Sequence, residues 1–218
     1  MKRKRVKVLL FCFLILGSVS KNYAQEVGSS SEATIKSIAQ KMFVDINNKD
    51  FDAILEMTHP KVYDLVPKEQ MKSVLVTMFE GTEEFSIEIP KIIPEYKLSK
   101  VFKVVDENLE YAFISYDMRM EMTFHNQDFD EDAKEMMIPM MKAQGMEVEF
   151  ISNNAMKILM KDRLTIIVKD NSTNNKWAMV NYDPDSPLFF QILPSSLIEI
   201  SKEYKQSLML ESKKENEN

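Results

Sequence analysis

The residues of this 218-residue sequence that could carry out chemistry are few, since it has two histidines, one cysteine and four glycines. Three-histidine and thiolate zinc sites need more ligands than these. Nucleotide-binding loops need clustered glycines, and the glycines here are isolated. The composition therefore argues against a zinc enzyme and against the common nucleotide-binding motifs.

General acid–base catalysis remains open, with His59 as its centre. A carboxyl group buried beside it would have a raised pKa, which suits proton transfer near neutral pH. Each candidate also has a simpler interpretation, as a solvated charge or a core aromatic, and the following proline makes His59 a natural helix-terminating residue. The candidate partners are Asp45, Asp52, Tyr63 and Tyr116.

Methionine is common, with 17 residues, and an exported protein with alternating Met118, Met120 and Met122 invites a copper(I) interpretation. A second group, Met136 to Met141, recurs at helical spacing. Methionine also fills irregular core gaps and lines adaptable binding surfaces. Because both groups have the spacing of an apolar face, we favour this second interpretation and expect no metal and no cofactor.

Residues 1–24 have the pattern of a secretory signal peptide. A basic start is followed by the apolar run Val8–Leu16, which is too short for a stable membrane anchor, and then by small residues. Cleavage after Ser20 or, preferably, after Ala24 is expected. The protein is therefore expected to be secreted or periplasmic, with no stable membrane span after cleavage.

The expected mature chain is acidic and free of cysteine, because the single cysteine, Cys12, lies in the signal segment. Removal of residues 1–24 leaves 22 basic against 34 acidic residues, a net charge of −12. Such a charge repels a phosphate polyanion, so nucleic acid is not an expected partner. Without disulfides, the chain must be stabilised by burial of apolar residues.

The first third of the mature chain predicts three amphipathic helices. Apolar residues recur at helical spacing from Ile35 to Ile46. Asp50 can cap a second helix that ends near His59, and Pro67 can open a third that ends at Gly81.

After Gly81 the apolar period changes to two, which predicts strands. The extended runs lie at 85–89, 96–105, 109–124, 148–151, 155–169 and 176–182. A helix with Pro139 in it interrupts them at 126–147, where proline should kink or split it. The pattern predicts one α+β domain over 25–210, with a strongly curved antiparallel sheet packed on the first helices, the helical insertion and a C-terminal helix. A charged tail over 211–218 is expected to be disordered.

This order of elements resembles the nuclear transport factor 2-like superfamily, over about residues 31–183 apart from the insertion. The resemblance rests on the opening stretch Ile35–Phe79, with its turn Asn47–Asp52, and on Lys176-Trp177 leaving the last hairpin. It implies a curved sheet that wraps the first helix into a cone with a pocket. Members include isomerases, cyclases, dehydratases and binding domains, and no catalytic residue carries over.

We therefore expect a non-enzymatic module that binds an apolar small molecule or a protein partner. The alternatives are a cofactorless isomerase, dehydratase or hydrolase that uses a carboxylate with His59 or a tyrosine, and a copper(I)-binding protein. The residues expected to line the ligand pocket are His59, Tyr63, Tyr116, Met118, Met120 and Trp177.

Overall fold

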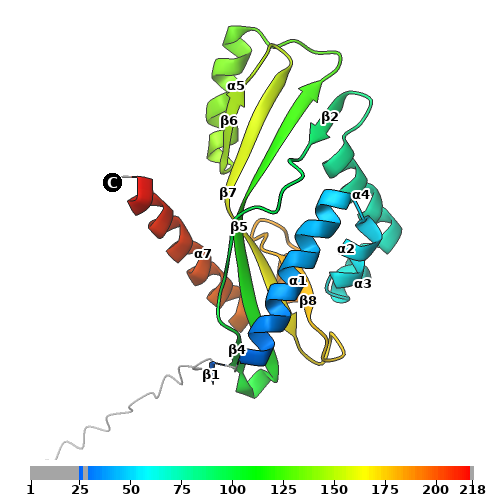
Figure 1. Ribbon diagram of the computed structural model, residues 1–218, viewed down its shortest axis with the longest axis vertical. Helices are drawn as coiled ribbons and strands as arrows, with labels where there is room; N and C mark the ends of the chain where they lie inside the picture. The colour runs from blue at the N-terminus through cyan, green and yellow to red at the C-terminus, as the bar shows by residue number, and fades with distance from the viewer. Residues whose placement is uncertain (1–24, 27–28, 217–218) are drawn as a thin grey trace, which may run out of the picture.

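The computed structural model describes residues 25–26 and 29–216 and has the α+β architecture that the sequence predicts (Figure 1). The signal segment predicted at 1–24 lies outside the described residues. Helices come first, an antiparallel sheet follows, and a long helix ends the chain. Within the described residues, no helix is both long and apolar enough to span a membrane.

Four helices precede every strand of the sheet except a two-residue strand at Gln25–Glu26. Asp50 caps the second of them, as predicted, by accepting a hydrogen bond from the Ala53 amide at 3.0 Å. The short helix that begins just after Pro60 was not predicted, because five residues are too few to show a helical period. The helices are α1 (Ser29–Asn48), α2 (Phe51–Met57), α3 (Lys61–Leu65) and α4 (Lys68–Glu80).

The sheet is built around two long antiparallel strands, β5 and β7, which pair along nearly their whole length. β4, β3 and β2 pair with the free edge of β5, and β8 and β6 pair with the free edge of β7, so the sheet stays open. The strands are β1 (Gln25–Glu26), β2 (Phe85–Glu88), β3 (Tyr96–Leu98), β4 (Phe102–Val104), β5 (Leu109–Phe124), β6 (Met146–Phe150), β7 (Ala155–Lys169) and β8 (Ala178–Asn181).

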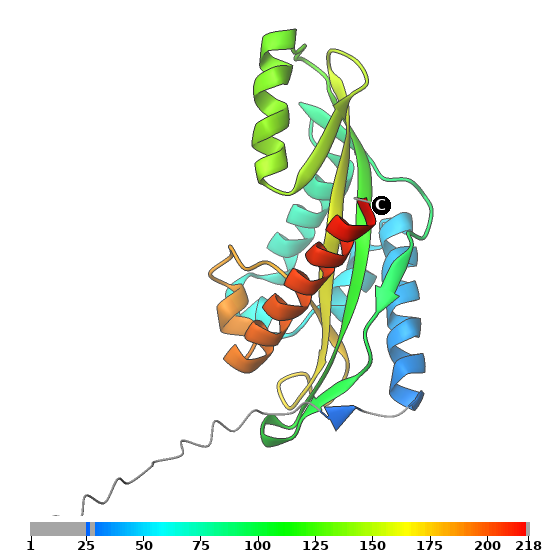
Figure 2. The same ribbon diagram turned by 90° about the vertical axis from the view of Figure 1, so that its left-hand side faces the viewer.

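The first half of β5 and the second half of β7 form the part of the molecule that we call the body. Here both faces of the sheet are buried, because α1 lies on one face and α7 on the other (Figures 1 and 2). Ala112 and Ile114 lie on the face that α1 covers. Tyr111 and Phe113 face α7, where the Phe113 ring stacks on Tyr204 with centroids 4.4 Å apart.

The second half of β5 and the first half of β7 form what we call the arm, together with β2, β6 and the helix α5 (Glu131–Ala143). α5 lies beside β6 (Figure 1) and runs unsplit through Pro139, contrary to one of the two outcomes expected. Pro139 is exposed, so its missing amide leaves a carbonyl that water can reach.

The C-terminal helix is longer than predicted. A short helix, α6 (Phe189–Ile192), precedes α7 (Ser195–Asn216). The tail expected to be disordered from Glu211 is instead helical as far as Asn216. Two features explain this difference: the segment has no glycine or proline to end the helix, and Ser212 bonds Asp162 of β7 at 2.9 Å.

Candidate functional site

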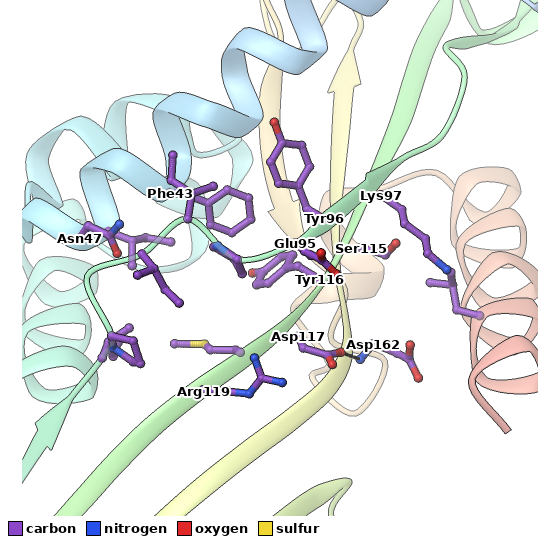
Figure 3. Close-up of a pocket in the computed structure, with 18 of the residues that line it drawn as sticks. Phe43, Asn47, Glu95, Tyr96, Lys97, Ser115, Tyr116, Asp117, Arg119 and Asp162 are labelled. Carbon is purple, nitrogen blue, oxygen red and sulfur yellow. Dashed lines mark hydrogen bonds between the residues drawn. The ribbon is translucent and has the colours of Figure 1, made fainter. Parts of the chain in front are cut away.

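A cleft of about 810 Å³ opens beside the middle of β5, where the body meets the arm (Figure 3). Its walls come from elements that are far apart in the sequence: the end of α1, the loop 89–95 between β2 and β3, residues 115–119 of β5 and the end of α7.

The cleft exists because the loop 89–95 leaves the sheet. β2 pairs with residues 121–124 of β5, and β3 pairs with 114–116, so residues 117–120 have no partner on that edge. The seven residues of the loop 89–95 thus run past only four residues of β5, so the loop is too long to lie flat along the edge. Pro90 and Pro94 have no amide hydrogen to give to a ladder, which keeps the loop out. Ile92 and Ile93 consequently stand 64% and 47% exposed.

The open edge of β5 presents main-chain groups to the cleft. On one side of the gap, the Phe113 carbonyl accepts the Ser99 N–H at 3.0 Å, and on the other side the His125 N–H donates to the Glu84 carbonyl at 2.8 Å. Both β5 residues therefore bond toward the β2–β3 side. The neighbour of His125 in the alternation, Phe124, instead donates its N–H toward β7, to the Asn154 carbonyl at 2.8 Å. Since strand residues alternate in direction, Asp117 and Arg119 direct their N–H and C=O groups into the gap. Among the described residues, no main-chain hydrogen bond joins them to the loop.

An apolar wall forms the α1 side of the cleft. Phe43 lies between two tyrosines, with ring centroids 5.3 Å from Tyr96 and 5.0 Å from Tyr116, the second pair edge to face. Ile46 and Met118 extend this wall toward the loop. Figure 3 shows the three rings gathered together on this side of the strand.

Charged and polar side chains form the α7 side. Asp162 of β7 has a φ of 52° and donates its N–H to the Asp117 carboxylate at 3.0 Å. The Lys205 ammonium donates to the Asp162 carbonyl, and the Ser212 hydroxyl donates to its carboxylate. Burial lowers the pKa of Lys205, and the nearby Asp162 opposes that shift. These bonds fasten the end of α7 to the middle of the sheet.

The structure brings together two of the six residues predicted to line a pocket. Tyr116 and Met118 lie in the cleft, and Met120 lies one strand repeat farther along the same face of β5. Trp177 packs against the core beneath α1, with the Lys169 ammonium 5.1 Å from its ring centroid.

His59 and Tyr63 lie outside the cleft. The Tyr63 hydroxyl donates to the carbonyl of Leu55, and burial raises its pKa. His59 is 1% exposed and its main-chain N–H donates to Met179 of β8 at 2.9 Å. Tyr63 thus ties α3 to α2, and His59 ties the link between these two helices to β8.

The ring of His59 belongs to a side-chain cluster that resembles a catalytic triad only in composition. Its Nδ1 accepts the Lys61 amide at 3.2 Å, so its proton lies on Nε2, 3.3 Å from the Ser172 hydroxyl. That hydroxyl donates to Asp170 at 2.6 Å. His59 therefore donates to Ser172 and cannot accept its proton. The cluster fastens the loop after β7 to α3.

The buried His59 predicts a loss of stability on acidification. Burial lowers its pKa below the ordinary value of 6.5, so the unfolded chain binds this proton first. Its contribution to the free energy of unfolding is complete above about pH 6.5 and decreases as the pH falls toward the folded pKa. We expect His59→Gln to remove this part of the pH dependence in urea unfolding measured from pH 5 to 8.

The exposed His125 provides the control for this experiment. The variant His125→Gln should follow the pH dependence of the unchanged protein. Parallel pH profiles for His59→Gln and the unchanged protein would contradict the assignment of the effect to His59.

Asp45 and Asp52 are held in ion pairs. Asp45 is 7% exposed and lies 2.6 Å from the Lys41 ammonium, one helical turn away. Asp52 accepts two bonds from Lys72 of α4, which lower its pKa. Neither carboxylate lines the cleft.

The methionines of β5 do not converge on one point. Met118, Met120 and Met122 pair with Met160, Ile158 and Met156 of β7. Alternate strand residues are about 6.8 Å apart, which separates the outer two by roughly 13 Å. In the part of the chain that the structure describes, no group of three or more His, Cys, Asp or Glu side chains could hold a metal ion.

Several cleft residues were not predicted from the sequence, among them Phe43, Arg119 and Asp162. Phe43 and Arg119 fit a helix face and a strand face, and nothing local marks them as neighbours. One signal was available: the segment Pro90-Lys-Ile-Ile-Pro94 places two isoleucines between prolines, which a paired strand does not tolerate.

No protein-family model, curated protein or solved structure matches the chain. The cleft is therefore interpreted from its own geometry. It combines an apolar wall, a polar wall and a floor of main-chain groups directed outward from β5.

Proposed function

We propose that this chain is a non-enzymatic binding module whose cleft beside β5 takes a molecule with an apolar body. The observation that carries the proposal is the cleft of about 810 Å³, with Phe43, Tyr116 and Met118 on one wall. Ligand pockets commonly have this size, an apolar lining and a few polar groups that fix orientation.

The proposal includes export, with residues 1–24 as the signal peptide. We also propose that the chain belongs to the nuclear transport factor 2-like superfamily, which includes binding domains. Acid–base catalysis by His59 is not part of it, since His59 lies outside the cleft and donates to Ser172.

Binding of the neutral, apolar dye Nile red tests the proposal. We expect the purified protein to bind the dye with enhanced fluorescence, and Met118→Lys to weaken binding at least about tenfold. A lysine there places a strongly hydrated ammonium on the apolar wall, and desolvating it costs more than the roughly 1.4 kcal/mol of a tenfold change.

Met136→Lys is the matched control, because Met136 of α5 is 73% exposed and lies outside the cleft. This variant should bind Nile red as the unchanged protein does. Equal loss in both variants, or no binding by the unchanged protein, would contradict the proposal.

A further inference from the structure

We infer that the ligand of this cleft is a short extended peptide segment that pairs with the open edge of β5, with an apolar residue between two polar ones. The inference rests on the proposed use of the cleft for binding and adds the chemical class of the ligand. Three observations carry it: the gap in the sheet, the direction of the β5 main chain and the different chemistry of the two walls.

The gap has room for three or four extended residues. Residues 117–120 lack a partner between β2 and β3, and a strand rises about 3.3 Å per residue, so the open edge is roughly 13 Å long. β2 and β3 occupy the edge on either side. A longer strand cannot lie flat in this space, whereas three or four residues can.

The main chain of β5 supplies the recognition. The N–H and C=O groups of Asp117 and Arg119 face the gap, so an extended peptide can exchange bonds with both residues. Strand addition of this kind derives its affinity from main-chain bonds and its specificity from the alternate side chains. The first and third peptide residues would lie opposite Arg119 and Asp117.

The two walls determine the preferred side chains. Residues directly opposite each other on paired strands share a face. The middle peptide residue, opposite Met118, therefore points toward Phe43 and Tyr116, while its neighbours share the face of Asp117 and Arg119. This geometry favours an apolar residue flanked by polar ones.

The test uses acetyl-Thr-Leu-Thr-amide and two N-methylated forms of it, titrated into the full protein and followed by the amide resonances of Asp117 and Arg119. N-methylation of the third residue removes a donor that faces β5, and we expect it to weaken binding at least tenfold. N-methylation of the middle residue removes a donor that faces away from β5, and should change affinity less than threefold.

Each outcome distinguishes this inference from the proposed function. Equal effects of the two methyl groups, or no binding of the tripeptide while Nile red still binds, would contradict the inference that the ligand is a peptide. The proposal that the cleft binds a molecule with an apolar body would remain. If neither the peptide nor Nile red binds, the proposed function itself fails. The reordered peptide acetyl-Leu-Thr-Thr-amide should bind more weakly than the original, since it places threonine against the apolar wall.

Discussion

Gly81→Ala is expected to lower the free energy of unfolding by at least about 3 kcal/mol, or to prevent folding. Gly81 ends α4 and has a φ of 86°, a region that side chains with a Cβ rarely adopt. A Cβ atom there would lie 2.2 Å from the Phe85 carbonyl oxygen and 2.8 Å from the Cα of Ser86. These are main-chain atoms at the start of β2, so relief requires the arm to shift. Urea unfolding followed by circular dichroism measures the effect.

Gly145→Ala separates backbone strain from crowding. Gly145 has a similar φ of 80°, but a Cβ atom built there meets no atom within 4 Å. We expect Gly145→Ala to lower the free energy of unfolding by only about 1 kcal/mol, the cost of holding alanine in the left-handed conformation. Equal losses in the two variants would mean that the crowding at Gly81 is relieved without cost.

A pair of proline variants in β5 is expected to differ just as strongly. Met120 directs its N–H toward β7, opposite Ile158 in the centre of the sheet. Met120→Pro therefore removes a ladder hydrogen bond, and we expect a loss of about 3 kcal/mol or more. Arg119, its neighbour, directs its N–H into the gap, so Arg119→Pro removes no bond of the sheet and should fold. Thermal unfolding of both variants measures the difference.

The same pair connects stability to binding. Arg119→Pro removes one of the two N–H groups that β5 offers to a peptide. It should therefore weaken the binding of acetyl-Thr-Leu-Thr-amide, while Nile red still binds. If Arg119→Pro destabilises the protein as much as Met120→Pro, the main chain of Arg119 is not free of the sheet, and the inferred strand addition is wrong.

Elements with long, regular patterns were predicted well from the sequence. The apolar stripe from Ile35 to Ile46 lies inside α1, and the runs 109–124 and 155–169 match β5 and β7 at both ends. Each of these elements buries one consistent set of side chains, so local spacing carries the information. The α+β fold class follows from their order.

Tertiary packing decided the features that were not predicted. Residues 114–124 of β5 alternate between apolar and polar types, a pattern that by itself indicates one buried face. The body nevertheless buries Tyr111 and Phe113 under α7 as well. The expected strand over 96–105 is divided into β3 and β4, because the Ser99 side chain accepts the Phe113 amide in place of a ladder bond. Such contacts join residues that local sequence does not relate.

The candidate site was predictable only in part for the same reason. Tyr116 and Met118 were identified because they share a strand face, and both line the cleft. The opposite wall depends on where α7 crosses β7 and on the left-handed conformation of Asp162. His59 attracted attention as a reactive side chain, but its chemistry is used to hold a loop.

The cleft also lies where the body and the arm are joined by two continuous strands, β5 and β7. One uninterrupted strand, β5, passes from the body, where helices cover both faces, into the arm, which carries α5. Where the two regions meet, residues 117–120 of β5 have no strand along their outer edge. Filling the gap with another strand would add the missing row of main-chain hydrogen bonds at this point. We expect an occupied cleft to make the connection between the body and the arm more rigid than an empty one.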